Sequence, residues 1–160
     1  MGLDQCLYAT YDDCEVYDSE SKTYINYLLR GDEIADWRKN YPLMEWIEKN
    51  LEVTIRDCAY YILLPEHIQK LNEECREVFN LYQNCGRRVL KRVEKLFLKY
   101  FPQNNWNKTD TFFDKDTDKL VTINHKISER DMDHLENIID GLEMHMRWSP
   151  NKKTIFYANW

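Results

Sequence analysis

Two histidines and an aspartate near the end of the sequence are of the types that hold a metal ion or transfer a proton. His134 and His145 are eleven residues apart, about three helical turns, so both imidazoles would point from one face of a helix. Asp131 lies three residues before His134 and could complete a metal-binding or acid/base group. Because no further ligand stands at a recognised spacing, we expect only an exposed polar face on an amphipathic helix, with no metal and no cofactor.

Alternating carboxylates also occur, as Asp114-x-Asp116-x-Asp118. A calcium-binding EF-hand loop begins with this alternation, but it needs glycine at its sixth position and a bidentate glutamate at its twelfth. Lys119 and His125 occupy those two places. The sequence therefore predicts a solvated loop here.

The five cysteines form no C-x-x-C pair and are odd in number, which favours reduced thiols over disulfides. A nucleophilic cysteine needs a low thiol pKa and a nearby base. Cys75 lies on an apolar helical stripe and Cys58 lies where a strand should begin, so we expect both to be buried. A small hydrolase built on His134, His145 and neighbouring acids is one of three functions considered, and it is the least favoured of them.

Charge is distributed unevenly, and the two charged regions predict binding surfaces. Residues 87–99 hold six basic residues and one acid, whereas residues 1–36 hold nine acids and two bases. The basic residues at helical spacing could contact phosphates or an acidic partner; they are Arg88, Lys91, Arg92, Lys95 and Lys99. They make nucleic-acid or nucleotide binding the alternative function, although lysine and arginine also simply favour a helix.

The acidic segment is rich in tyrosine and could mimic the charge of a nucleic acid toward a DNA- or RNA-binding protein. Its candidate contact residues are Asp12, Asp13, Glu15, Tyr17, Asp18, Glu20 and Tyr24. A second candidate contact is the polar stretch 102–119, which is predicted to be a long loop and is therefore either functional or mobile. Its candidate residues are Trp106, Phe112, Phe113, Asp114 and Asp116.

These residues must be positioned by one domain spanning residues 1–160, because 160 residues suit a single core. Hydrophobic residues at 43% can fill that core, and a net charge of −6 suits a soluble particle rather than a general nucleic-acid coat protein. No basic start precedes an apolar run and no long apolar window occurs, so we expect no signal peptide and no membrane association.

The fold class is predicted to be α+β, with a small, mainly antiparallel sheet that pairs the N- and C-terminal strands. Strands are expected at 6–11, 59–63, 120–127 and 154–160, and an extended stretch at 15–29. Pro42 should open a short helix, residues 65–100 should form a long helix that is kinked or divided near Asn84, and Ser128 with Asp131 should cap a helix over 128–147. Ile34 and Trp37 suggest a helical turn after Gly31.

Four short motifs occur in an order that resembles a family of small proteins of tailed bacteriophages. They are Met1-Gly2-Leu3-Asp4 followed by Leu7-Tyr8, Trp37-Arg38-Lys39 followed by Trp46, Asp57-Cys58-x-x-Tyr61-x-Leu63-x4-Ile68-x2-Leu71-x3-Cys75, and Tyr157-x-x-Trp160. Some members are labelled phosphoglycerate kinases, but 160 residues cannot hold two nucleotide-binding domains and no glycine-rich phosphate loop is present. The family usually carries a Gly-Phe-Phe-Phe-Gly loop where this chain has Phe112-Phe113 without glycines.

The resemblance implies expression in the cytoplasm of an infected bacterium. It further implies a dispensable, non-enzymatic accessory protein that binds a host protein, in many such cases a component of a defence system. Counter-defence by such binding is the function we expect, with the acidic segment and the 102–119 stretch as its contacts.

Overall fold

The computed structural model describes residues 4–10, 31–38, 40–102, 110–123, 127–148, 150 and 154–159. Four helices and six strands lie in these ranges. The helices are α1 (Tyr41–Leu51), α2 (Pro65–Asn84), α3 (Lys91–Tyr100) and α4 (Glu129–Trp148). The strands are β1 (Asp4–Thr10), β2 (Gly31–Arg38), β3 (Ala59–Leu63), β4 (Asp110–Asp114), β5 (Lys119–Ile123) and β6 (Thr154–Asn159).

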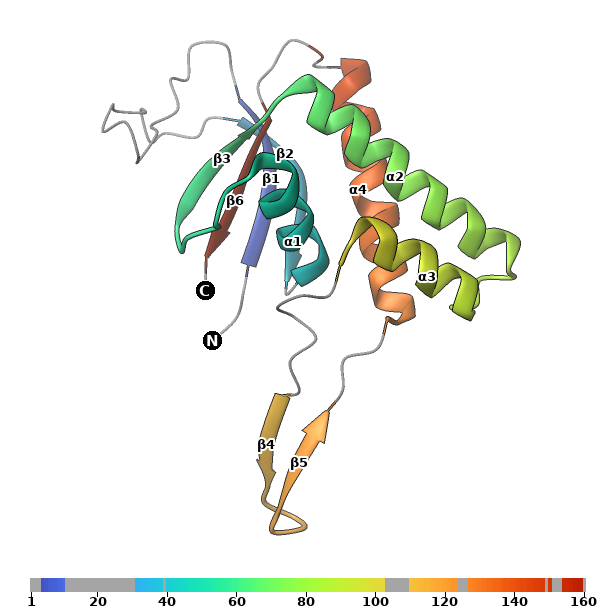
Figure 1. Ribbon diagram of the computed structural model, residues 1–160. Coiled ribbons are helices and arrows are strands. Elements are labelled where there is room, and N and C mark those ends of the chain that lie inside the picture. The colour runs from blue at the N-terminus through green and yellow to red at the C-terminus, as the bar shows by residue number, and fades with distance from the viewer. Residues whose placement is uncertain are drawn as a thin grey trace.

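An antiparallel sheet in the order β2-β1-β6-β3 forms one layer of the molecule, with the helices packed on one side of it (Figure 1). Its two central strands are the first and last of the chain, so Leu7 lies opposite Phe156. The predicted α+β class and the pairing of the terminal strands are therefore confirmed. β4 and β5 form a separate two-stranded hairpin.

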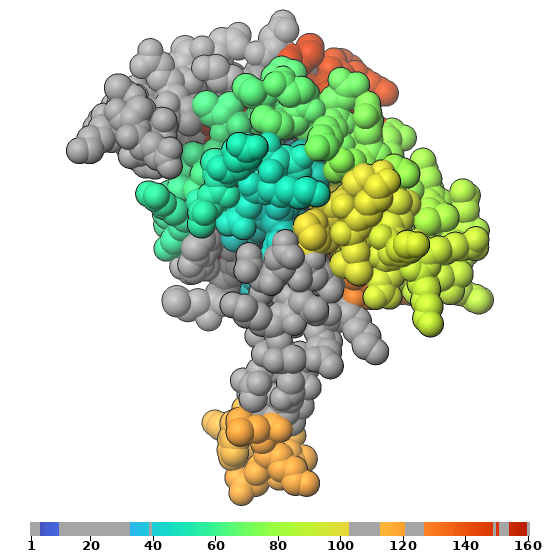
Figure 2. Space-filling model, viewed as in Figure 1, coloured from blue at the N-terminus to red at the C-terminus, as the bar shows by residue number. Residues whose placement is uncertain are grey.

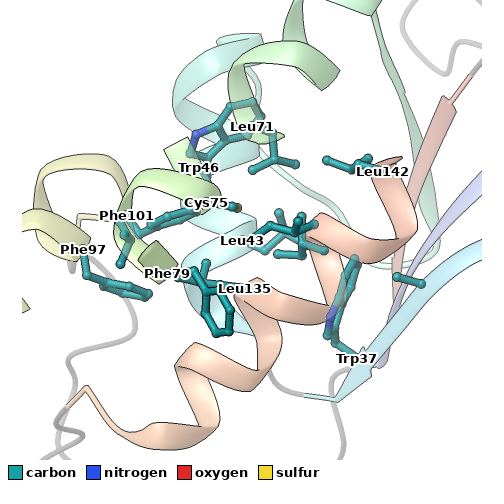
Figure 3. Close-up of a cluster of buried hydrophobic side chains, with 14 of the residues drawn as sticks. Trp37, Leu43, Trp46, Leu71, Cys75, Phe79, Phe97, Phe101, Leu135 and Leu142 are labelled. Carbon is teal, nitrogen blue, oxygen red and sulfur yellow. The ribbon is translucent and has the colours of Figure 1, made fainter. Parts of the chain in front are cut away.

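The core lies between the inner face of this sheet and the helices. Trp46, Leu43 and Leu71 are fully buried there, and Figure 3 shows them beside Cys75, with Trp37 contributed by the sheet. Burying side chains of this size stabilises the fold by roughly 1.5–3 kcal/mol each. The helical periodicity in the sequence marks the core residues of α1 and α2 among them, because an amphipathic helix buries positions three and four apart.

α1 is held against the sheet by two buried polar side chains. The Gln5 side chain donates to the Asn40 carbonyl oxygen at 2.9 Å and accepts from the Asn40 backbone N–H at 2.7 Å. The Asn40 side-chain oxygen in turn accepts from the Leu43 N–H at 3.3 Å, which caps the helix. Since a buried polar group without a partner is costly, these bonds fix where α1 begins.

The long helical segment is divided, as predicted, because α2 ends in a Schellman motif. Gly86 has φ +66°, its N–H donates to the Gln83 carbonyl at 3.1 Å, and the Arg87 N–H donates to the Tyr82 carbonyl at 3.1 Å. The chain then turns back into α3. Arg88 lies in the connection of residues 85–90. The basic spacing in the sequence predicts it on a helix, but it precedes α3.

Two sequence predictions about this architecture are wrong. Residues 31–38 form β2 and not a helical turn: Leu7 and Tyr8 of β1 pair with Ala35 and Glu33, so Ile34 is the extra residue of an irregularity in β2. This break in the alternation of β2 leaves Ile34 and Trp37 three residues apart, which imitates a helical spacing. Residues 102–119 are not one long loop, because 110–114 form β4. The extended stretch expected at 15–29 lies outside the described residues.

Candidate interaction surfaces

The β4–β5 hairpin stands away from the sheet and helices, at the lower end of the molecule (Figures 1 and 2). Phe113 and Leu120 are paired directly across its two strands. Phe113 is 55% exposed and Leu120 is 72% exposed, the latter among the most exposed large apolar side chains of the described residues. An apolar pair on a projecting hairpin is typical of a surface that a partner covers.

The turn of the hairpin is closed by the aspartates that resemble a calcium loop. Asp114 Oδ1 accepts from the Asp116 N–H at 3.0 Å, and Asp114 Oδ2 accepts from the Thr117 hydroxyl at 2.7 Å. These hydrogen bonds, that from Thr117 first, lower the pKa of the Asp114 carboxyl. Asp118 has φ +53°, a left-handed conformation that aspartate tolerates. Asp114 therefore orders a turn, and the described part of the chain contains no group of three or more metal-ligating side chains.

The hairpin contains part of the predicted contact set and one residue that the set omits. Phe113, Asp114 and Asp116 lie on or beside it, the backbone of Phe112 lies in β4, and Trp106 lies outside the described residues. The sequence analysis predicts only that Leu120 begins a strand. The signal for its place on the hairpin is a pair of apolar runs that stand on either side of an aspartate-rich turn, because this pattern is typical of a β-hairpin.

The basic residues of α3 form a continuous face. Lys91, Arg92, Lys95 and Lys99 are exposed, whereas Val93 and Phe97 of the same helix are fully or almost fully buried. Figure 2 shows α3 uncovered on the visible side of the molecule. Together with the exposed Arg88 just before the helix, these four residues are called the basic face below.

The two histidines of α4 have structural positions. His145 is buried, and its Nε2 lies 2.9 Å from the Thr154 hydroxyl at the start of β6, so the expectation of an exposed polar face is wrong for this residue. His134 is half-buried, and burial lowers its pKa despite the nearby Asp131. Asp131 Oδ2 accepts from the Ser128 N–H at 2.8 Å, which confirms the predicted cap. The contacts of His145 and Asp131 therefore join α4 to β6 and cap α4, which are structural roles.

Of the two cysteines predicted to be buried, one is buried and the other is exposed. Cys75 is buried as expected, and burial raises the pKa of its thiol well above the ordinary value. Cys58 is exposed, not buried, because it lies in a turn with φ +57° just before β3. The thiols of the described cysteines, which also include Cys6 and Cys85, are free.

The sheet face opposite the core carries tyrosines that the sequence analysis does not include among the candidate contact residues, although Tyr157 belongs to one of the four motifs. Tyr60 of β3 stacks on Tyr157 of β6, with ring centroids 4.7 Å apart. Tyr157 lies opposite Cys6, and the hydrogen bond that the Tyr157 hydroxyl donates to Cys58 raises the pKa of Tyr157 to about 12. Alternation along β6 is the signal that places Tyr157 away from the buried Phe156 and Ala158.

The acidic, tyrosine-rich contact residues proposed from the sequence, from Asp12 to Tyr24, lie outside the described residues. No helix within the described ranges is long and apolar enough to cross a membrane. Compared with protein-family models, curated proteins and solved structures, the chain shows no significant match.

Proposed function

We propose that the chain is a non-enzymatic phage accessory protein that binds a host protein and inhibits a bacterial defence component, with the β4–β5 hairpin as its contact. The four ordered motifs that resemble tailed-phage proteins support the setting. Two of the candidate catalytic side chains support a non-enzymatic role, because His145 contacts the Thr154 hydroxyl and Asp131 caps α4.

The observation that carries this proposal is the exposed pair Phe113 and Leu120 on a projecting hairpin. A two-stranded hairpin on its own is marginally stable in water. Contact with a second surface would bury the apolar pair and order both strands. In a protein interface a few residues dominate the binding energy, and truncating such a residue costs about 2 kcal/mol or more, roughly a thirtyfold loss of affinity. Phe113 and Leu120 are the candidates for such residues here.

Site-specific crosslinking tests the proposal. A photoreactive phenylalanine analogue replaces Phe113, and in a control it replaces Gln69, which is exposed on α2. After irradiation in host cells, the variant at position 113 should form one discrete adduct with a host protein that the variant at position 69 does not form. Identical adducts from both positions, or no adduct from position 113, would overturn the hairpin as the contact.

The identity of the partner decides the second half of the proposal. An adduct with a defence protein should disappear when Leu120 is replaced by Ser, because the apolar pair is then halved. The same substitution should remove protection of a sensitive phage in a strain carrying that defence system. Protection that persists without the adduct would separate the hairpin from inhibition.

A further inference from the structure

We propose that the basic face binds the phosphate backbone of a nucleic acid. Its residues are Arg88, Lys91, Arg92, Lys95 and Lys99, and it is a second surface, separate from the hairpin. Binding here does not depend on the function proposed above.

The cations of α3 are gathered on one side of the helix. At about 100° per residue, Lys91, Lys95, Lys99 and Arg92 fall within an arc of roughly 100°. The centre of this arc is nearly opposite the buried Val93 and Phe97. The packing that holds α3 on the core therefore turns all four charges outward.

These charges are available to a ligand. Within the described ranges, none of the five residues forms an ion pair with a carboxylate, even though the chain has 28 acidic and only 22 basic residues. By contrast, the neighbouring Arg87 is paired with Glu136 on α4 at 3.5 Å. Glu94 is the single acid on α3, and its position lies outside the basic arc.

The length of the basic face suits a chain of phosphates. Lys91 and Lys99 are eight residues apart, so their backbones are separated by about 12 Å along the helix. Successive charges on one nucleic-acid strand are about 3.4 Å apart along the axis, so three or four phosphates fit this length. Four contacts to a single strand predict that log Kobs falls with log salt with a slope of about −3.

Insertion of α3 into a membrane fits the structure less well. An amphipathic helix binds a bilayer by burying its apolar side among the lipids. The apolar side of α3 is already occupied, because Val93 is fully buried and Phe97 is 1% exposed. The basic face can therefore act through charge alone, as contacts to a phosphate backbone do.

Fluorescence anisotropy with a labelled single-stranded DNA oligonucleotide, over a range of salt concentrations, tests this inference. The variant Lys91→Gln/Lys95→Gln/Lys99→Gln removes three charges at exposed positions and keeps residues that favour a helix. It should bind at least tenfold more weakly at low salt, and its salt slope should be reduced by about 2.

A matched control removes three exposed charges elsewhere, as Lys49→Gln/Arg56→Gln/Arg147→Gln. This variant should keep the wild-type slope, which distinguishes the basic face from net charge. Circular dichroism should show the same helix content in all three proteins. The variant Phe113→Ser/Leu120→Ser should also bind DNA normally, so failure of the hairpin proposal and failure of this one are distinguishable.

Three results would overturn the inference. The first is a wild-type protein that binds neither DNA nor RNA at low salt, and the second is an α3 variant that keeps the wild-type slope. Binding of polyglutamate with the same affinity and slope as DNA would instead identify a general surface for acidic partners.

Discussion

α4 crosses β2 at Gly141, and this contact predicts a measurable defect. A Cβ atom added there would lie 2.6 Å from the backbone oxygen of Ile34 and 2.8 Å from its Cγ2. The side chain of Ile34 can rotate, but its backbone oxygen is held in β2 by the paired residues on either side, Glu33 and Ala35. We therefore expect Gly141→Ala to destabilise the protein, although alanine is the better helix former.

The size of the defect follows from two opposing effects. Replacing glycine by alanine within a helix stabilises it by about 1 kcal/mol. Overpacking a tight contact costs about 1–3 kcal/mol, and the upper end applies because the nearest atom belongs to the backbone. The net loss should be about 2 kcal/mol in the free energy of unfolding, or a fall of roughly 4–8 °C in Tm for a chain of this size.

Urea denaturation followed by circular dichroism measures this loss. Gly86→Ala is the matched control. A Cβ atom at Gly86 meets nothing within 4 Å, but the alanine backbone must adopt φ +66°. It should cost about 1 kcal/mol through backbone strain alone. Adding Ile34→Ala to Gly141→Ala should restore only part of the stability, since the contact with the Ile34 oxygen remains. A Gly141→Ala protein as stable as the wild type would refute the reasoning.

Three further perturbations test the fold and the thiols. Gln5→Leu leaves the buried Asn40 N–H without a partner, whereas the Asn40 carbonyl still accepts from the Met44 N–H at 3.4 Å. The substitution should lower the free energy of unfolding by about 1–3 kcal/mol, measured by urea denaturation. Burial holds the pKa of His134 below its ordinary 6.5, so at mildly acidic pH the unfolded chain binds a proton at this imidazole more readily than the folded protein does. The free energy of unfolding should therefore fall as the pH drops from 7 through the pKa of the folded protein, and it should fall less steeply in His134→Gln. A thiol reagent should label Cys58 in the native protein but reach Cys75 only after unfolding, as mass spectrometry of digests would show; equal rates at both sites would contradict their assigned burial.

Most helices and the terminal strands could be predicted because their signals are local. Pro42 and Pro65 mark the starts of α1 and α2, and Gly86 marks the end of α2. The strands β3 and β6 follow from runs of β-branched and aromatic residues. The predicted pairing of the first and last strands, β1 and β6, is confirmed by the register that places Leu7 opposite Phe156.

The missed elements depend on contacts that are distant in the sequence. The irregular register between β1 and β2 hides the strand pattern around Ile34. The burial of His145 depends on Thr154, which only the fold brings to it. The β4–β5 turn contains no glycine, since Asp118 takes the left-handed conformation instead, so the usual hairpin signal was absent.

The central claim is that the apolar pair on the hairpin binds a host protein. Its most direct test is quantitative affinity capture from nuclease-treated host lysate, comparing the wild type with Phe113→Ser/Leu120→Ser. The control is Met144→Ser/Trp148→Ser, which removes a similarly exposed apolar pair from α4. The account predicts that the wild type and the α4 variant both capture one host protein and that the hairpin variant does not capture it. Equal capture of this protein by all three would contradict the account.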